Sequence, residues 1–516
     1  MFTITKGGIC MIIERYLREV ATIDPDADAM ETQGVWSTWA QLASLSQRVQ
    51  ELMTDAGVPE GARVGLLLRS RAPQLAGFLA CIASGRCAVA FNPLLGPARL
   101  AADIGEQAPA VLIGVEQDLV GPEIADAADR ARIPMLQLPV AMDGSAEWRG
   151  DAAQVKPLVG RLRPEVLVEM LTSGTTGTPK RIALTRSSMD ESFIQGQKYE
   201  SGRKDSPALR SGVRIVTAPL THISGIFGAL TTLADGRKLV LQEKFQVEEW
   251  VAAIERHGSK VANLPPTALR MILDADIPRE RLASLLALRS GTAPVAPVII
   301  DAFLERYGLP VLVQYGATEF AGGVAGWTMR DFQSFYSAKR GSVGRMQRNI
   351  EARIVDAESG EILPFGMAGI LELRGSQLGD AAKWVRTTDR ATLDADNFLW
   401  INGRADNAIN RGGFKIHPDD VARVIGEHPA VKEAVVVGVP DRRLGEVPVA
   451  VMTLNPGVAP LDVAELRTYL SGKLLPYQVP ASFKFVDEIP RTPLLKPSTS
   501  EIKQLFSDFD SVPSSR

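Results

Sequence analysis

The stretch Leu171-Thr-Ser-Gly-Thr-Thr-Gly-Thr-Pro-Lys180 places five hydroxyl side chains, two glycines and a lysine within ten residues. Glycines let the backbone turn its N–H groups toward an anion, the hydroxyl groups add donors, and Lys180 adds a positive charge. It is not a Walker A loop, because only two residues separate Gly174 from Gly177. A Ser/Thr-rich surface turn is the plainer interpretation. The lysine and the strand-like run at 166–171 favour a loop that binds nucleotide phosphates.

The composition restricts the class of protein. A chain of 516 residues is too long for one compact core, so two or more domains are expected. The net charge of −3 gives no reason to expect nucleic acid or an anionic membrane as partner. Three cysteines without paired or metal-ligand spacing predict reduced thiols and a cytoplasmic protein. The four histidines form no short-spaced pair, which argues against a zinc site, and no apolar run is long enough to span a bilayer.

The pattern of apolar residues predicts an α/β fold. Strand-like runs without polar alternation are separated by helix-like runs through the first three quarters of the chain, which is typical of parallel-type sheets covered by helices on both faces. Residues 341–403 instead carry short alternating segments and predict a small β-barrel or meander. After Asp406 the pattern predicts a small α+β unit, with its first helix over 417–428. The helix pattern at the start of the chain begins at Met11, so the first ten residues are expected to be an extension.

Further stretches also combine residues that suit nucleotide chemistry. Gln314-Tyr-Gly-Ala-Thr-Glu319 follows an apolar strand, and ligands of open α/β sheets bind at the carboxyl ends of strands. An aromatic ring there can stack on a purine, a hydroxyl can contact phosphate, and Glu319 can hold magnesium. Taken alone, a plain strand-to-loop turn is an equally good interpretation. Asp389 is a good acceptor for two ribose hydroxyls, although a lone aspartate is by default a solvated charge.

Together, in this order, the motifs resemble adenylate-forming enzymes: acyl- and aryl-CoA synthetases, peptide-synthetase adenylation domains and firefly luciferase. The resemblance runs from about Met11 to Lys496 and includes Gly403-Arg-Ala-Asp406 and Pro490-Arg-Thr-Pro-Leu-Leu-Lys496. The chain departs from the family pattern at four positions. Arg181 and Thr388 replace glycines, Arg186 replaces a histidine, and Leu495 replaces a glycine. We expect Arg181 and Arg186 to add positive charge near a triphosphate.

The resemblance implies a role for each matching residue. Lys496, Thr318 and His222 are implied as catalytic, and Glu319 as both catalytic and the magnesium ligand. ATP or AMP is implied to contact Thr172, Ser173, Gly174, Thr175, Thr176, Lys180, Tyr315, Gly316, Ala317, Asp389 and Arg404. Gly412 and Gly413 are implied to line the tunnel for coenzyme A. The acyl pocket is expected to be formed by Ile226, Phe227, Asn263, Gly291, Thr292, Gln314 and Phe320, which are mostly apolar or small and suit an uncharged acyl or aryl body.

The implied domains are an adenylation domain at 1–403, a hinge at 404–408 centred on Asp406, and a mobile domain at 409–516. The implied activity is that of an ATP- and Mg²⁺-dependent acyl- or aryl-CoA ligase acting on a small carboxylic acid. Two alternatives remain: transfer of the acyl-AMP to a separate carrier protein, and a non-catalytic nucleotide-binding relative. A homodimer is left open.

Overall fold

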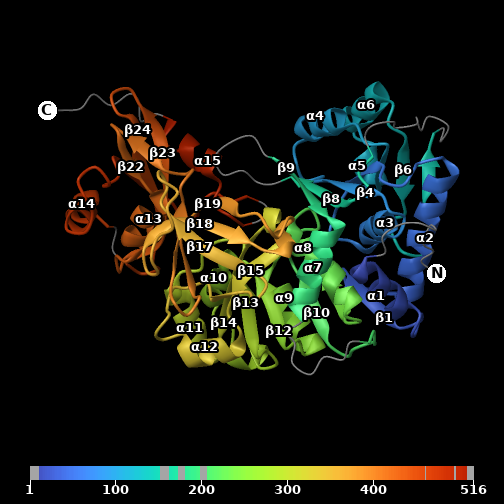
Figure 1. Ribbon diagram of the computed structural model, residues 1–516, viewed down its shortest axis with the longest axis horizontal. Coiled ribbons are helices and arrows are strands. Elements are labelled where there is room, and N and C mark those ends of the chain that lie inside the picture. Colours follow the sequence, from blue (N-terminus) through green and yellow to red (C-terminus); the bar gives the residue numbers. More distant parts are fainter. Residues whose placement is uncertain are drawn as a thin grey trace.

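A computed structural model describes residues 11–150, 162–171, 180–197, 206–458, 461–492 and 495–507. These residues form five sheets with helices packed around them, and the α/β fold predicted from the sequence is confirmed (Figure 1). The orange and red C-terminal unit lies at one end of the molecule in this view. Among the described residues, no helix combines the length and the apolar character needed to cross a bilayer.

A seven-stranded sheet of order β7-β6-β5-β3-β4-β8-β9 forms the first layer. Its inner strands are parallel and its two edge strands are antiparallel. Its helix α3 is buried along its whole length, as expected for a helix with no polar face. The strands are β3 (Arg63–Leu67), β4 (Cys87–Phe91), β5 (Val111–Val115), β6 (Met135–Leu138), β7 (Glu147–Arg149), β8 (Val166–Leu171) and β9 (Arg181–Thr185), and the helices are α2 (Trp39–Asp55), α3 (Ala72–Ala83), α4 (Pro97–Gln107), α5 (Glu116–Leu119) and α6 (Pro122–Ala131).

Two further sheets build the centre of the molecule. One has the order β10-β11-β1-β2 and the other β12-β13-β14-β15-β16, with β12, β13 and β14 parallel. Their strands are β1 (Asp28–Thr32), β2 (Val35–Thr38), β10 (Val213–Val216), β11 (Lys238–Leu241), β12 (Val261–Leu264), β13 (Ala287–Ser290), β14 (Val311–Ala317), β15 (Gly322–Gly326) and β16 (Arg345–Met346). The associated helices are α1 (Ile12–Ala21), α7 (Arg186–Gln197), α8 (Ile223–Ala234), α9 (Val247–His257), α10 (Pro266–Asp274), α11 (Pro297–Tyr307) and α12 (Met329–Phe335), with the short turns η2 (Arg279–Leu282) and η3 (Thr318–Phe320).

Residues 351–404 form an antiparallel meander in which β17, β18, β19 and β20 pair in chain order. Of the two forms expected from the alternating sequence, the meander is the one present. Its elements are β17 (Glu351–Val355), β18 (Ala368–Arg374), the turn η4 (Ser376–Leu378), β19 (Val385–Leu393) and β20 (Leu399–Arg404).

After Asp406 the described residues form a five-stranded sheet with three helices, the small α+β unit that the change of pattern predicts, which is called the C-terminal unit. Its long central pair β23–β24 is antiparallel, and the helix α13 starts at Pro418, where a proline fits the first turn. The elements are β21 (Ile409–Arg411), β22 (Phe414–Ile416), α13 (Pro418–Gly426), β23 (Val431–Asp441), β24 (Gly445–Leu454), α14 (Val463–Ser471), β25 (Ser482–Phe485) and α15 (Thr499–Gln504).

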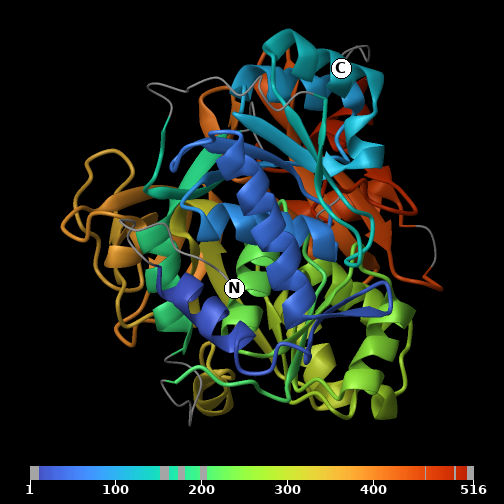
Figure 2. The same ribbon diagram turned by 90° about the vertical axis from the view of Figure 1, so that its right-hand side faces the viewer.

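Contacts distant in sequence fix α1, which stands in front of the strands beside α2 in Figure 2. The N-cap residue Met11 offers no side-chain cap to this helix. The cap comes from α7 instead, where the Asp190 carboxylate accepts hydrogen bonds from the backbone N–H groups of Ile12 at 2.8 Å and Ile13 at 3.0 Å. Asp190 therefore supplies the hydrogen-bond acceptors that the free N–H groups at a helix N-terminus need.

The buried Arg186 side chain joins four segments of the first core. Its guanidinium donates to the carbonyl oxygens of Pro164 at 3.0 Å, Ile82 at 3.2 Å and Arg86 at 3.1 Å. It also lies 3.5 Å from the sulfur of Met11. Arg181 is likewise held, by Asp103 at 2.6 Å and by the ring of Phe91. The expectation that these two arginines add charge near a triphosphate is therefore wrong, because both guanidinium groups bind protein groups and neither lines the large cavity described below.

We predict that Arg186→Met lowers the free energy of unfolding by about 3 kcal/mol, because methionine cannot replace the hydrogen bonds that this largely buried guanidinium donates to the carbonyl oxygens of Pro164, Ile82 and Arg86. Arg130→Met serves as the control, because this exposed arginine bonds only the carbonyl of Asp126 one helical turn away. Urea denaturation of both variants measures the difference. Equal stabilities of the two variants would contradict the structural role given to Arg186.

Candidate active site

A cavity of about 3070 Å³ lies between the central sheets, the meander and the C-terminal unit. It collects residues from four of the predicted motifs, although these are spread over more than three hundred positions of the sequence. The residues that line it include Lys180, His222, Tyr315, Gly316, Ala317, Thr318, Glu319, Asp389, Arg404, Asp406 and Lys496. The carboxyl end of β14 and the turn η3 contribute the central part of this list, which agrees with the rule that ligands bind beyond the carboxyl ends of parallel strands.

Tyr315 and Asp389 form one wall of the cavity. The Tyr315 hydroxyl donates to Oδ2 of Asp389 over 2.5 Å, which joins β14 to β19. Burial raises the pKa of Tyr315 well above its usual value, and the Asp389 charge raises it further, so the phenol stays protonated. Burial also raises the pKa of Asp389, while the Tyr315 hydrogen bond acts in the opposite direction. A carboxylate has several acceptor positions, so Asp389 can bind a ribose hydroxyl in addition to the phenol.

The chain crosses between its two parts at Arg404. The Arg404 guanidinium holds both oxygens of Asp406, at 2.8 Å and 2.6 Å. The hydrogen bond that Arg404 donates to Asp406 raises the pKa of Arg404. The backbone of Arg404 is hydrogen-bonded to Asp419 at the start of α13, and burial raises the pKa of that carboxyl. The crossing segment is thus held by groups from both parts.

The loop before Lys496 is anchored to the large N-terminal part. The carbonyl oxygen of Leu495 accepts from the Thr267 hydroxyl at 2.8 Å and from Arg491 at 3.1 Å. Leu495 has a φ of +59°, the left-handed conformation that glycine adopts easily and leucine does not. The chain therefore keeps at this position the backbone conformation that favours glycine, and the contact with α10 helps to hold it.

Lys496 enters the cavity as a half-buried cation. Burial lowers its pKa, the Arg404 charge lowers it further, and Glu319 acts in the opposite direction. His222 is close enough that the Lys496 charge contributes to lowering its pKa from 6.5 to about 4, although burial is the larger cause. His222 is also the N-cap of α8, where its Nδ1 accepts from the backbone N–H of Ser224 at 3.4 Å. Lysine, glutamate and a neutral imidazole therefore meet at one end of the cavity, which we call the reactive end.

Six of the seven residues expected in an acyl pocket line the cavity, and the part that they line is called its acyl side here: Phe227, Asn263, Gly291, Thr292, Gln314 and Phe320. Gly291 faces Gln314 so closely that a Cβ at this glycine would lie 3.0 Å from the Gln314 side chain. Thr292 has a φ of +73°, an unfavourable conformation for a β-branched residue of the kind that collects at functional sites. Ile226 is the exception, because its side chain is fully buried in the first hydrophobic core and does not line the cavity.

Two groups of predicted residues remain untested by this geometry. Thr172, Ser173, Gly174, Thr175 and Thr176 lie outside the described residues. Gly412 and Gly413 form the exposed turn of the β21–β22 hairpin, with φ values of +57° and +90°, and do not line the cavity. Their role stays a prediction that requires a different arrangement of the C-terminal unit.

The sequence analysis missed two arginines, Arg214 and Arg289, which also line this cavity. Each interrupts a short apolar strand, β10 or β13. A charge in an apolar strand was a detectable signal, but the direction of its side chain depends on how the strands are paired.

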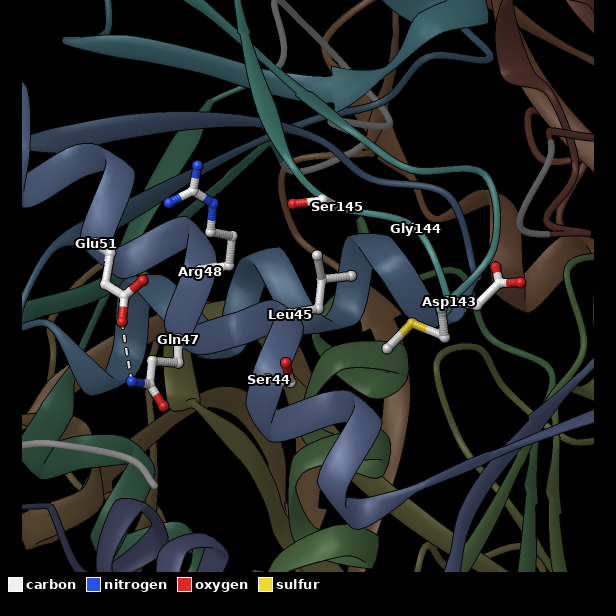
Figure 3. A pocket seen from close by; sticks show the side chains of 9 residues that line it. Ser44, Leu45, Gln47, Arg48, Glu51, Asp143, Gly144 and Ser145 are labelled. Atoms are coloured by element: carbon white, nitrogen blue, oxygen red, sulfur yellow. Dashed lines mark hydrogen bonds between the residues drawn. The ribbon is translucent and has the colours of Figure 1, made fainter.

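A second, smaller pocket of about 400 Å³ lies between α2 and residues 142–145 (Figure 3). Its polar residues include Gln47 and Glu51, which are hydrogen-bonded to each other at 2.9 Å one helical turn apart. None of the predicted motifs contributes to it, so the large cavity is the candidate active site.

Comparison with known proteins defines the class. The family described as AMP-binding enzyme matches residues 17–380, and the AMP-binding enzyme C-terminal domain matches residues 420–496. The chain therefore belongs to the AMP-binding enzymes, and the resemblance to adenylate-forming enzymes is confirmed. Its relatives include a 4-coumarate–CoA ligase-like protein of Oryza sativa subsp. japonica, 30% identical over 85% of this chain and 78% of the relative. Another is the indoleacetate–CoA ligase of Aromatoleum aromaticum, 29% identical over 96% of this chain and 98% of the relative.

Solved structures agree on the fold. The amide bond synthetase McbA of Marinactinospora thermotolerans is 28% identical and superposes with a TM-score of 0.77 over 96% of this chain and 100% of that chain. ATP-bound MatB of Rhodopseudomonas palustris has a TM-score of 0.81 over 96% of this chain and 99% of that chain, at 23% identity, and supports the fold alone.

We predict a pH dependence of stability that originates at His222. Its pKa falls from 6.5 to about 4 on folding, so the unfolded chain takes up a proton below about pH 6.5 while the folded protein does not. Folding is therefore penalised progressively as the pH falls from 6.5 to 4. Between pH 7 and pH 5 the wild type should lose about 2 kcal/mol more free energy of unfolding than His222→Gln.

Urea denaturation at the two pH values tests this difference. His428→Gln, which changes a histidine that does not line the cavity, should follow the wild type. The same pH dependence in wild type and His222→Gln would show that this imidazole is not held neutral.

Proposed function

We propose that this protein is an ATP-dependent acyl- or aryl-CoA ligase that activates a carboxylic acid as its acyl-AMP and then forms the CoA thioester. The observation that carries the proposal is the convergence of Lys496, Glu319 and the Tyr315–Asp389 pair on one cavity in a member of the AMP-binding enzymes. The names of the two CoA ligases among its relatives support the choice of CoA. The proposal specifies the acid only by class, as an aryl or a fatty acid.

In the first step a carboxylate oxygen attacks the α-phosphorus of ATP, and the bond from that phosphorus to the pyrophosphate oxygen breaks. The two reacting groups are both anions. Lys496 is positioned to lie between them, where its charge offsets their repulsion and stabilises the transition state. Thr318 supplies a hydroxyl to the α-phosphate, and Tyr315 and Asp389 fix the adenosine. The loop at 172–176 with Lys180 is proposed to bind the pyrophosphate part.

Glu319 fits the binding of Mg²⁺, because this ion is commonly held by one or two carboxylates together with substrate phosphates. In support of this role, Glu319 lines the same cavity as Lys496, and its charge raises the pKa of that lysine. A magnesium ion bound there would neutralise phosphate charge.

In the second step the CoA thiol attacks the acyl carbonyl, and AMP leaves. We propose that residues 409–516 turn about a hinge at 404–408 between the steps, leaving 1–403 in place. The turn would carry Lys496 out of the cavity and bring Gly412 and Gly413 toward it. Support comes from the ion pairs between the two parts, such as Lys432–Asp274 at 2.7 Å and Arg390–Asp420 at 3.2 Å, which are partly exposed and therefore contribute little to stability. We also propose a cytoplasmic location, in keeping with the free thiols of Cys81 and Cys87.

The first test is the identity of the products. With a panel of aryl and fatty acids, Mg²⁺, ATP and CoA, the enzyme should release AMP and pyrophosphate, and stoichiometric ADP would overturn the proposal. Thioester formation with CoA but not with a carrier protein separates the two acceptors. Failure of every acid to support ATP–pyrophosphate exchange would favour the non-catalytic alternative.

We predict that Lys496→Ala slows adenylation at least about 100-fold, the scale expected for one charged transition-state contact. Given preformed acyl-AMP, the same variant should make thioester at a near-normal rate. Lys383→Ala removes an exposed lysine that is 3.5 Å from Asp380 and serves as the control. Normal adenylation by Lys496→Ala would show that a cation other than Lys496 has the catalytic role.

Gly413→Leu should show the opposite pattern, because its side chain would obstruct a ligand passing the hairpin while the ATP site stays intact. Gly457→Leu is the matched control, since Gly457 also has a positive φ, of +75°, and open space around its Cβ position. Loss of the same half-reaction in Lys496→Ala and Gly413→Leu would contradict the two-arrangement scheme.

A further inference from the structure

Arg289 is exposed into the cavity from the middle of a sheet. It lies on β13, between β12 and β14, and its neighbours Leu288 and Ser290 are both buried. In the sheet register Arg289 stands beside Asn263 of β12, one of the residues expected in the acyl pocket. Since side chains alternate between the faces of a sheet, Arg289 shares its face with Gly291, two residues further along. Arg289 therefore belongs to the acyl side of the cavity.

Arg214 faces the same space from β10. Its guanidinium donates to the Thr231 hydroxyl at 3.4 Å, and burial lowers the pKa of Arg214. Burial also lowers the pKa of Arg289, and the Arg214 charge lowers it further, so the two guanidinium groups lie within electrostatic range of each other. We call Arg214 and Arg289 the distal arginine pair.

The distal arginine pair lacks the carboxylate partners that several other arginines of this cavity have. Arg69 pairs with Asp118 at 2.6 Å and Arg256 with Glu31 at 2.9 Å. Among the described residues, no carboxylate lies within ion-pair distance of Arg214 or Arg289, and the buried Asp235 acts on Arg214 only through a longer-range charge effect. Two cations held close together in a partly desolvated space are costly unless an anion binds between them.

The length of helix α8 gives the distance between the reactive end and the distal arginine pair. Its face on the cavity carries Ser224, Phe227, Gly228 and Thr231. His222, at its N-cap, lies by Lys496, and Thr231, nine residues further on, lies by Arg214. At 1.5 Å per residue the two ends are about 13 Å apart. A ligand activated at Lys496 would therefore reach the distal pair with its far end.

We propose that the acyl pocket selects an acid that carries a second carboxylate about 10 to 13 Å from the one being activated, and that the distal arginine pair binds this second carboxylate. This inference rests on the proposed function and specifies its substrate class. It replaces the uncharged acyl or aryl body expected from the sequence. Bidentate binding by guanidinium groups suits a carboxylate better than a neutral ester of the same shape.

The test compares each dicarboxylic acid with its own monomethyl ester. The panel runs from hexanedioic to hexadecanedioic acid and includes 4-carboxycinnamic acid. In ATP–pyrophosphate exchange the wild type should favour one or more diacids over their half-esters by about 10- to 100-fold in kcat/KM, the scale of a hydrogen bond to a charged group. Arg289→Gln should lose most of this preference, and Arg289→Lys should retain part of it.

Arg281→Gln is the matched control. It removes the same charge from an exposed arginine that pairs with Glu248 at 2.8 Å outside the cavity, and it should keep the wild-type preference. Melting curves show which variants are folded.

Calorimetric binding of the diacid and its half-ester without ATP is a readout independent of catalysis. The proposal is overturned if wild type binds both forms equally across the panel, or if Arg289→Gln leaves the ratio unchanged. It is also overturned if inorganic phosphate alone binds with the same dependence on Arg289 while no diacid does. Selective diacid binding that depends on Arg289, without exchange for any acid, would contradict the proposed adenylation and leave the distal anion site standing.

Discussion

The position of the Lys496 ammonium group inside a partly desolvated cavity is the constraint on which the rest of the site depends. Burial and the Arg404 charge both disfavour its protonated form, and Glu319 offsets this only in part. The cation is held there by contacts of its loop with Thr267 and Arg491. At the distal arginine pair two cations lie without a carboxylate in ion-pair distance among the described residues, so this part of the cavity is electrostatically incomplete until an anion enters it. ATP supplies anions at one end, and a second carboxylate would supply one at the other.

Most elements of the fold could be predicted from the sequence, because their signals are local. The predicted alternation of apolar strands and helices is present, for example in β3, α3 and β4, and α1 begins at Ile12, one residue after the predicted start at Met11. Apolar runs bounded by Gly and Pro are enough to place such elements. For the segment that forms the meander at 351–404, the sequence was compatible with either a barrel or a meander. The choice depends on which strands pair, and the pattern within each strand does not reveal this.

Site residues that stand in sequence motifs could be predicted, whereas residues whose position depends on tertiary contacts could not. Tyr315, Glu319, Asp389 and Lys496 stand in motifs and meet as expected. Ile226 was placed wrongly because the sequence does not reveal which side of α8 faces the cavity. Arg181 and Arg186 were misplaced for the same reason, since their partners Asp103, Ile82 and Arg86 are distant in sequence.

The cap on α1 has a consequence for synthesis on the ribosome. This helix leaves the exit tunnel early, but its N–H groups are satisfied by a residue 178 positions later. At translation rates of about 5 to 20 residues per second, the helix waits roughly 10 to 35 seconds for its partner. During that interval its apolar face, with Ile13, Leu17 and Val20, is exposed on the nascent chain. The N-terminal segment is thus a natural client for chaperones that bind emerging apolar helices, until α7 is made and closes the core.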